Sequence, residues 1–309
     1  MALHTTAVTG TSAEKRTRLA ERIRRRDLVV APGVFDLVSA RLADRVGFEC
    51  LYATGYGIVA SHLGLPDAGL ATYSDMVGRI GQIASMTATP LVADGDTGYG
   101  GFLNVQHTVR GYEAAGACAI QLEDQEFPKK CGHMLERRVI DTVDAAAKIR
   151  VAVESRESRD FLVIARTDSR TSLGLDEALR RAEAYLRAGA DMLFVESPES
   201  VEEMERIGRT FDVPLVANMV EGGRTPVLAA ADLARLGYRL AIFPVVSLLA
   251  AAAAMERSYE ALKRDGSSAQ VGVPLYPFGA FSALMGFGAV SEFEKKLTVM
   301  IASGSDGPR

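Results

Sequence analysis

Short, continuous apolar runs alternate along this 309-residue chain with longer segments in which apolar residues recur at helical spacing. The apolar runs lie at 28–31, 50–53, 90–93, 119–122, 161–165, 192–195, 214–217 and 240–243. The helical segments between them include 36–46, 104–115, 141–155, 175–188, 199–211, 228–236 and 246–264. Strands that are buried on both faces have such unbroken apolar sequences, and parallel strands are joined by helices. The pattern therefore predicts an α/β protein whose eight parallel strands close into a (β/α)8, or TIM, barrel.

Glycines support this order of elements, because several helical segments end in a glycine just before the next strand. Gly47, Gly116, Gly189 and Gly237 have this position. Helices often end at a residue with a left-handed backbone, which glycine adopts without a steric penalty. We therefore expect these four glycines to be helix C-caps.

The segments that flank the barrel pattern complete a single predicted domain, 1–309. We expect a disordered tail at 1–12, a charged N-terminal helix at 13–26, the barrel at 27–265 and a C-terminal helical extension at 266–309. The extension has an apolar stripe that includes Phe281, Met285 and Phe293. Because a closed barrel does not need this stripe, we expect it to dock on the barrel or on a neighbouring subunit.

Composition and charge narrow the classes of partner. The net charge of −4 gives no reason to expect a nucleic acid or an anionic membrane as a partner. No apolar run reaches the ~18 to 20 residues of a membrane span, and the N-terminus lacks the apolar core of a signal peptide. Three cysteines without a spacing pattern indicate free thiols and a reducing compartment, so we expect a cytoplasmic protein.

Charged and carboxamide side chains follow five of the eight predicted strands. They are Asp94 and Asp96 after the third strand, Glu123 after the fourth, Arg166 after the fifth, Glu196 after the sixth and Asn218 after the seventh. The carboxyl ends of all strands meet at one rim of a barrel, where such folds carry their catalytic groups. The sequence therefore predicts an active site at this rim.

Asp94 and Asp96 stand two residues apart on a segment expected to be extended, so both side chains are predicted to point the same way. Two carboxylates held so close repel each other unless a cation or a proton lies between them. With Glu123 on the next strand they form an oxygen-rich set that suits Mg²⁺, or Mn²⁺, better than zinc. The alternative is that these acids cap helices or bind backbone amides.

The segment after the fourth strand carries a thiol among basic residues. Cys131 has Lys129, Lys130, Gly132 and His133 as neighbours. The lysines are expected to favour the thiolate, which suits a regenerable proton donor or a nucleophile. The alternative is an incidental loop cysteine. By contrast, the other two cysteines, at 50 and 118, lie in or beside apolar runs and are expected to be packing residues.

The second strand leads into a turn with two glycines, Thr54-Gly55-Tyr56-Gly57. Such a turn can present backbone N–H groups to a carboxylate or enolate oxygen. It can equally be an ordinary tight connection between a strand and a helix. The glycines at 94–101 match no nucleotide-binding motif, so we interpret them as a flexible turn.

Taken together, five motifs resemble the isocitrate lyase/phosphoenolpyruvate mutase superfamily. They are DGDTGYGG (94–101), LEDQEFPKKCGH (122–133), ARTDS (165–169), FVES (194–197) and NMVEGG (218–223). The resemblance implies a (β/α)8 barrel with a C-terminal helix exchanged between subunits of a homotetramer. It also implies one Mg²⁺ bound by Asp94, Asp96, Glu123 and Asp67. The implied substrate-binding residues are Thr54, Gly55, Tyr56, Gly132, Arg166 and Asn218, and the implied catalytic residues are Cys131, Glu196, Lys130 and His133.

The K-K-C-G-H motif is typical of the carbon–carbon lyases of this superfamily. Methylisocitrate lyases have an arginine after the eighth strand, and Leu249 stands at the matching position here. The residues around the K-K-C-G-H and NMVEGG motifs are more similar to those of the 2,3-dimethylmalate lyase and petal death protein group. The resemblance thus implies Mg²⁺-dependent retro-aldol cleavage of a small 2-alkylmalate to a 2-oxo acid and a carboxylate. The alternatives are oxaloacetate hydrolysis or decarboxylation, methylisocitrate cleavage, and a metabolite-binding barrel without catalysis.

Overall fold

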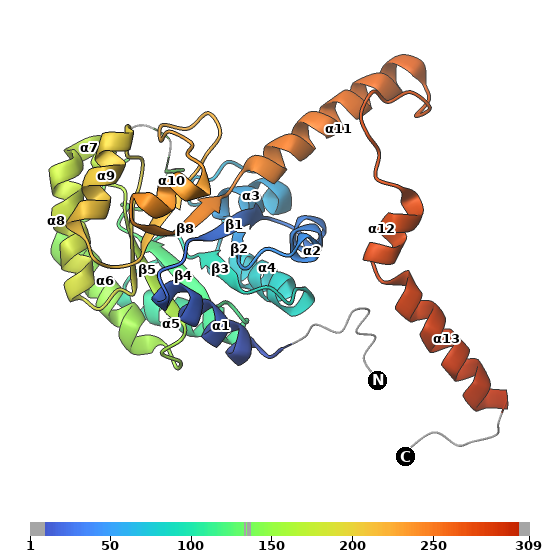
Figure 1. The fold of residues 1–309 in the computed structure, drawn as a ribbon, viewed down its shortest axis with the longest axis horizontal. Coiled ribbons are helices and arrows are strands. Elements are labelled where there is room, and N and C mark those ends of the chain that lie inside the picture. Colours follow the sequence, from blue (N-terminus) through green and yellow to red (C-terminus); the bar gives the residue numbers. More distant parts are fainter. Residues whose placement is uncertain (1–9, 133, 135–136, 303–309) are drawn as a thin grey trace. The chain divides into compact units, whose positions relative to one another are not determined.

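The computed structural model describes residues 10–132, 134 and 137–302. Its eight parallel strands form a closed barrel in sequence order, β1 to β8, with β8 paired to β1 (Figure 1). The strands are β1 Val29–Val34, β2 Leu51–Ala53, β3 Leu91–Asp94, β4 Ala119–Glu123, β5 Leu162–Thr167, β6 Met192–Val195, β7 Leu215–Asn218 and β8 Tyr238–Phe243. Each of the eight apolar runs is therefore a strand, and the predicted fold class is confirmed.

Helices connect the strands and surround the barrel (Figure 1). They are α2 Leu37–Val46, α3 Gly55–Ile58, the π-helix Val59–Leu63, α4 Tyr73–Met86, α5 Phe102–Ala114, α6 Thr142–Ser155, α7 Arg170–Leu173, α8 Leu175–Arg187, α9 Val201–Thr210 and α10 Ala230–Arg235. The helix α11, Val246–Asp265, follows β8. The four glycines predicted as C-caps all have a left-handed backbone, with φ between 91° at Gly47 and 102° at Gly189. Gly47 is the C-cap residue of α2, as predicted. The other three glycines each stand one residue beyond the C-cap of their helix, which is Ala115, Ala188 or Leu236.

The N-terminal helix α1, Ser12–Arg24, covers the amino ends of the strands. It begins at a capping box in which Thr11 and Glu14 bond to each other's backbone N–H groups. Its buried residues Leu19 and Ile23 belong to one apolar cluster with Cys50 and Cys118 inside the barrel. The packing role predicted for these two cysteines is thus confirmed. The predicted disordered tail falls largely on residues outside the described range.

The chain divides into two compact units, Gly10–Ala251 and a second unit that includes residues 252–302. Within the second unit, α12 (Phe278–Leu284) is followed by α13 (Phe287–Ala302). Exchange of this extension between subunits stays a prediction. Among the helices described here, none has the length and apolar character needed to cross a membrane.

Candidate active site

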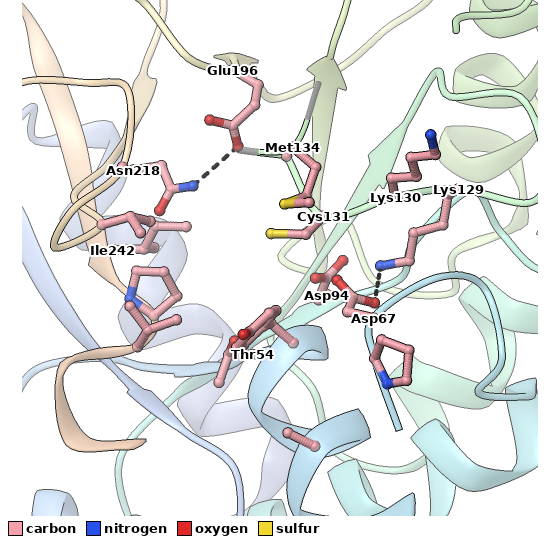
Figure 2. A pocket seen from close by; sticks show the side chains of 18 of the residues that line it. Thr54, Asp67, Asp94, Lys129, Lys130, Cys131, Met134, Glu196, Asn218 and Ile242 are labelled. Carbon is pink, nitrogen blue, oxygen red and sulfur yellow. Dashed lines mark hydrogen bonds and ion pairs between the residues drawn. The ribbon is translucent and has the colours of Figure 1, made fainter. Parts of the chain in front are cut away.

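A cavity of about 630 Å³ opens at the carboxyl ends of the strands. Its lining includes most of the predicted site residues, namely Thr54, Tyr56, Asp67, Asp94, Glu123, Lys130, Cys131, Gly132, Arg166, Glu196 and Asn218 (Figure 2). Gly55 and Asp96 contact the lining residues Asp94 and Lys129, respectively, and His133 lies outside the described residues. The strand order therefore brings together groups that are up to 164 positions apart in the sequence, from Thr54 to Asn218.

Asp94, the last residue of β3, is held in place from inside the barrel. Its Oδ1 atom accepts hydrogen bonds from the Asp96 backbone N–H at 3.1 Å and from Gln121 Nε2 at 3.4 Å. The Tyr52 hydroxyl group in turn donates to Gln121 Oε1 at 3.1 Å. Gly55 packs against the other oxygen, because a Cβ atom there would lie 2.6 Å from Asp94 Oδ2. Both oxygens of Asp94 thus have fixed positions.

The turn after β2 presents fewer backbone N–H groups than its sequence suggests. Gly55 begins the short helix α3, and Thr54 is the N-cap residue. The Gly57 N–H donates to Thr54 Oγ1 at 3.4 Å, so this amide is already used within the turn. The requirement for glycine at position 55 comes from its close approach to Asp94.

The expectation that Asp96 lies on an extended segment and points the same way as Asp94 is wrong. β3 ends at Asp94, and Asp96 has a left-handed backbone with φ of 47°, so the segment is not extended there. Its carboxylate lies 2.6 Å from Lys129 Nζ, which lies 2.5 Å from Asp67 Oδ1 on its other side. Lys129 therefore already supplies a positive charge between these two acids.

The two lysines beside Cys131 lie in different surroundings, and their predicted effect on the thiol stays a prediction. Lys129 is buried, and burial pulls its pKa down, but Asp96, Asp67 and Glu123 outweigh burial and hold the pKa well above the ordinary value. It is thus a permanent cation of the acid cluster. Lys130 is exposed, and its side chain and that of Cys131 point in different directions (Figure 2).

Negative charge in this cluster remains under-compensated in spite of Lys129. Burial raises the pKa of Asp96 to about 7 and that of Glu123 well above its ordinary range. Glu123 Oε1 is buried and accepts no hydrogen bond from any described residue. No three His, Cys, Asp or Glu side chains in the described ranges are grouped closely enough to hold a metal directly. A cavity-lining carboxylate pair with an unused oxygen nonetheless fits a hard divalent cation that keeps several of its waters.

Arg166, near the end of β5, is surrounded by the carboxylates of Glu123, Asp168 and Glu196. Its Nε and Nη2 atoms donate to Asp168 at 2.8 and 2.9 Å, and Nη2 lies 3.2 Å from Glu196 Oε2. Asp168 also accepts from the buried Arg137. Burial favours a raised carboxyl pKa, but the two arginines outweigh it and keep the pKa of Asp168 below its ordinary value. Arg166 is therefore a charged donor of fixed orientation.

Glu196, directly after β6, is held by three donors at the edge of the cavity. Its Oε2 accepts from Asn218 Nδ2 at 3.0 Å and faces Arg166, while Oε1 accepts from the Ser197 N–H at 2.7 Å. The sulfur of Cys131 points into the same cavity (Figure 2). A carboxylate, a guanidinium group and a thiol thus face one space that also reaches the acid cluster.

Sequence reasoning missed three residues that build this site. Lys129 was not separated from Lys130, and nothing in two adjacent lysines of a loop shows which one is buried. Asp168 stands two residues after Arg166, a spacing that puts both on one side of an extended segment and was a usable signal. Arg137 carried no local signal, because its partner Asp168 is 31 positions away.

Comparison with known proteins places the chain in a family. A family model described as phosphoenolpyruvate phosphomutase matches residues 19–263. The chain is 47% identical to 2,3-dimethylmalate lyase of Eubacterium barkeri, over 90% of this chain and 96% of that protein. The chain therefore belongs to the phosphoenolpyruvate mutase/isocitrate lyase superfamily, as the motifs predicted.

Two solved structures extend the comparison. Oxaloacetate acetylhydrolase in complex with 3,3-difluorooxalacetate matches with a TM-score of 0.84 and 33% identity, over 95% of this chain and 98% of that chain. Phosphonopyruvate hydrolase in complex with oxalate and Mg²⁺ matches with a TM-score of 0.80 and 30% identity, over 93% and 98%. The lyase relatives act on carbon–carbon bonds, and the superfamily points to a divalent metal. The chain is therefore an enzyme of this superfamily, and the alternative of a metabolite-binding barrel without catalysis is not supported.

Proposed function

We propose that this protein is a Mg²⁺-dependent lyase that cleaves the C2–C3 bond of a 2-alkylmalate such as 2,3-dimethylmalate. The products are a 2-oxo acid and a simple carboxylate. The observation that carries the proposal is that the thiol of Cys131 shares one cavity with Asp94, Arg166 and Glu196. A proton donor is needed opposite a metal and carboxylate-binding site when a carbon–carbon bond breaks heterolytically.

Asp94 and Glu123, together with Asp67 and Asp96, are the residues that would hold Mg²⁺. When bound, the cation lowers the pKa of the substrate hydroxyl group and neutralises the adjacent carboxylate. The orphaned Glu123 Oε1 and the raised pKa of Glu123 support a cation at this place. Lys129 lies between Asp67 and Asp96 and compensates part of their negative charge.

The chain's own residues carry the proton transfers. Glu196, whose carboxylate is oriented by Asn218 and Ser197, accepts the proton of the C2 hydroxyl group. As the C2–O bond becomes a carbonyl, the C2–C3 bond breaks and its electron pair passes to C3 beside the second carboxylate. Cys131 donates its proton to C3, and the thiolate is reprotonated from solvent. Arg166 holds the half of the substrate that becomes the 2-oxo acid.

The apolar part of the lining favours an alkyl group over a third carboxylate. Val220, Ile242, Pro244, Val245 and Leu249 line the cavity beside the polar groups. Leu249 stands where methylisocitrate lyases have an arginine, so a tricarboxylate would lack its partner here. The second candidate is oxaloacetate hydrolysis, which the similarity to oxaloacetate acetylhydrolase favours.

Release of 2-oxo acid from a panel of substrates tests the proposal. The panel comprises 2,3-dimethylmalate, 2-methylmalate, malate, methylisocitrate and oxaloacetate, each with Mg²⁺ and with EDTA. The Asp94→Ala variant, purified in parallel, measures contaminating lyase activity. We expect the highest kcat/KM for a 2-alkylmalate. Conversion of oxaloacetate to oxalate and acetate, without cleavage of any malate, would instead establish the second candidate.

We further propose a homotetramer in which the C-terminal extension packs on a second copy of the chain. Phe278 is 87% exposed and Phe287 is 63% exposed, and Ile301 is similarly uncovered. Apolar surface of this kind is normally covered in solution. Light scattering at micromolar concentration tests the assembly, and a monomer would contradict it.

The free thiols support a cytoplasmic location as a separate proposal. Cys50, Cys118 and Cys131 form no disulfide, which is usual in a reducing compartment. Cell fractionation of the native source with a thiol-trapping reagent tests this, and recovery outside the cytoplasm would contradict it.

A further inference from the structure

The backbone on both sides of Cys131, at Lys130 and at Gly132, is held by buried polar side chains that do not line the cavity. On the N-terminal side, the Lys130 backbone N–H donates to Gln125 Oε1 at 2.9 Å, and Gln125 Nε2 donates to the Lys130 carbonyl oxygen at 2.8 Å. The carboxamide of Gln125 thus pairs with Lys130 as a neighbouring strand would. Because the Lys130 carbonyl belongs to the peptide group that joins it to Cys131, this pairing fixes the orientation of that group.

Gln125 is itself anchored at the base of the loop. It is only 2% exposed, and it forms an isolated antiparallel bridge with Val139. The next residue, Glu126, donates its backbone N–H to the Arg138 carbonyl oxygen at 2.9 Å. The carboxamide that holds Lys130 therefore extends from a backbone that is tied to the returning end of the loop.

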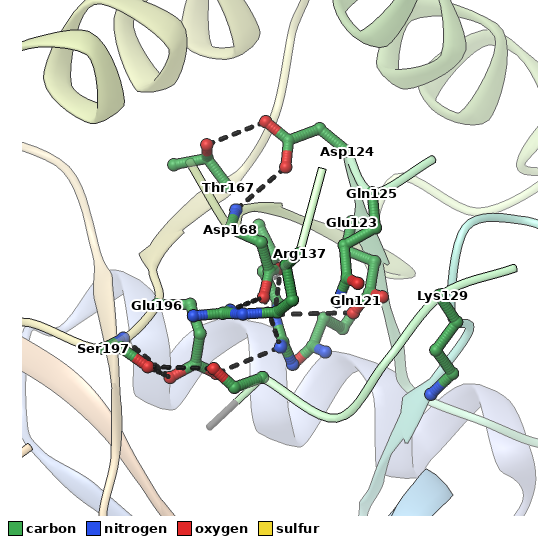
Figure 3. A network of polar contacts seen from close by, with 12 residues as sticks. Gln121, Glu123, Asp124, Gln125, Lys129, Arg137, Thr167, Asp168, Glu196 and Ser197 are labelled. Atoms are coloured by element: carbon green, nitrogen blue, oxygen red, sulfur yellow. Dashed lines mark hydrogen bonds and ion pairs between the residues drawn. The ribbon is translucent and has the colours of Figure 1, made fainter. Parts of the chain in front are cut away.

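On the C-terminal side, Ser197 holds Gly132. The Ser197 Oγ atom lies 3.0 Å from the Gly132 carbonyl oxygen and 3.2 Å from Glu196 Oε1. A hydroxyl group has one proton, and Glu196 Oε1 already accepts the Ser197 N–H at 2.7 Å. The hydroxyl proton is therefore best used by the Gly132 carbonyl. Figure 3 shows Ser197 beside Glu196, at the opposite side of the network from Gln125.

Ser197 adopts a backbone that serine rarely adopts. Its φ is 58°, and the residue is fully buried. Such a conformation outside glycine costs of order 1–3 kcal/mol and persists where the surroundings require it. In this case it aims both the N–H group and the hydroxyl group of one residue at Glu196 and Gly132.

Gly132 passes too close to the catalytic groups to move independently of them. A Cβ atom on Gly132 would lie 2.2 Å from Arg166 Nη2 and 2.8 Å from Glu196 Oε2. The backbone that carries Cys131 therefore rests directly on the Arg166–Glu196 pair. Whatever holds Gly132 there also sets the distance between the thiol and the substrate that this pair binds.

We propose that Gln125 and Ser197 are positioning residues for the Cys131 thiol. This inference rests on the proposed function, in which Cys131 is the proton donor. Gln125 orients the peptide group that joins Lys130 to Cys131, and Ser197 holds the carbonyl group of the following residue, Gly132. A misplacement of about 1 Å at a reacting group can lower the rate ~10²-fold. Loss of either side chain therefore lowers the rate of protonation and leaves ground-state binding intact.

The test compares Gln125→Ala and Ser197→Ala with exposed controls on α4, Gln82→Ala and Ser85→Ala. Turnover of 2,3-dimethylmalate is measured with Mg²⁺, and binding of oxalate is measured by calorimetry. We expect kcat to fall ~10- to 100-fold in both test variants, with KM and oxalate affinity unchanged within about threefold, and no change in the controls. Ser197→Gly, which adopts the left-handed backbone without strain, is expected to lose kcat as Ser197→Ala does, because both lack the hydroxyl group.

The Cys131→Ala background separates this inference from the proposed function. If the two residues act through the thiol, adding Ser197→Ala or Gln125→Ala to Cys131→Ala leaves the residual kcat unchanged within about threefold. An inactive Cys131→Ala together with normal kcat in both single variants would overturn only the positioning role. The same holds if each variant lowers kcat equally with and without the thiol. Near-normal turnover of Cys131→Ala would overturn the proton-donor assignment itself.

Discussion

The two ends of the barrel bury charged groups in different ways. At the amino ends of the strands, α1 places Leu19 and Ile23 in an apolar cluster. A buried ammonium group there, that of Lys15, donates to the backbone carbonyls of Ala84 and Thr87 at 2.8 and 2.7 Å. At the carboxyl ends, by contrast, carboxylates, two arginines and Lys129 are packed together around a cavity.

This difference shows that burial stabilises one end and activates the other. At the amino end, burial lowers the pKa of Lys15 and raises the pKa of the Cys118 thiol. These groups serve packing and helix capping there. At the carboxyl end, burial leaves Glu123 with a raised pKa and an unused oxygen, which is a reason to bind a cation. One barrel thus separates stability from catalysis along its axis, as is usual for this fold.

The largest effect is expected from removing the cation or its main ligand at the carboxyl end. Exhaustive EDTA treatment, or Asp94→Ala, should reduce turnover to the uncatalysed level, because a metal supplies several kcal/mol of transition-state stabilisation. Added Mg²⁺ should restore the EDTA-treated wild type and not the variant. Circular dichroism checks that the fold is retained. Full activity of the EDTA-treated enzyme would refute metal dependence.

Cys131→Ala is expected to lower turnover ~10²- to 10⁴-fold, the usual contribution of a positioned general acid. Binding of oxalate should persist, because Arg166 and the acid cluster hold the other half of the substrate. Cys131→Ser should also be poor, since a hydroxyl group is a weaker acid than a thiol. Turnover and oxalate calorimetry are the measurements. Near-normal turnover of the alanine variant would favour oxaloacetate hydrolysis or decarboxylation.

Ile23→Ala probes the opposite end of the barrel. It should lower the free energy of unfolding by about 2–5 kcal/mol, as truncation of a buried aliphatic side chain does, with kcat unchanged under conditions where the variant is folded. The exposed Val46→Ala on α2 is the matched control, expected within about 0.5 kcal/mol of wild type. Urea unfolding and turnover are measured on both. A loss of kcat without a loss of stability would show that the two ends are coupled.

Cys118→Ala is expected to have the smallest effect, a loss of about 1 kcal/mol in unfolding free energy and no loss of turnover. Its thiol is fully buried, and burial raises its pKa, so it stays protonated and unreactive in the folded protein. In native wild type, an alkylating reagent should therefore modify Cys131, with Cys50 and Cys118 reacting only after unfolding. Mass spectrometry of the labelled peptides decides this. Equal rates at all three thiols would contradict the prediction.

The sequence by itself determined the barrel and the rim that carries the site. Eight apolar runs predicted all eight strands, because a strand buried on both faces needs a continuous apolar sequence. Glu123, predicted from its place after the fourth apolar run, lines the cavity, whereas the next residue, Asp124, accepts hydrogen bonds from Thr167 and Tyr185. The left-handed glycines at the helix ends were also predictable from the local sequence, because each stands between a helical segment and the next apolar run.

Only the tertiary structure decided how the loops at this rim place their side chains. Periodicity ends where a strand ends, so it did not predict that Lys129 would be buried between two acids while Lys130 is exposed, or that Asp96 turns away from Asp94. The contact between Ser197 and Gly132 joins residues 65 positions apart. Such contacts depend on where the barrel brings two loop backbones together. The sequence around each partner does not indicate which distant residue will lie beside it.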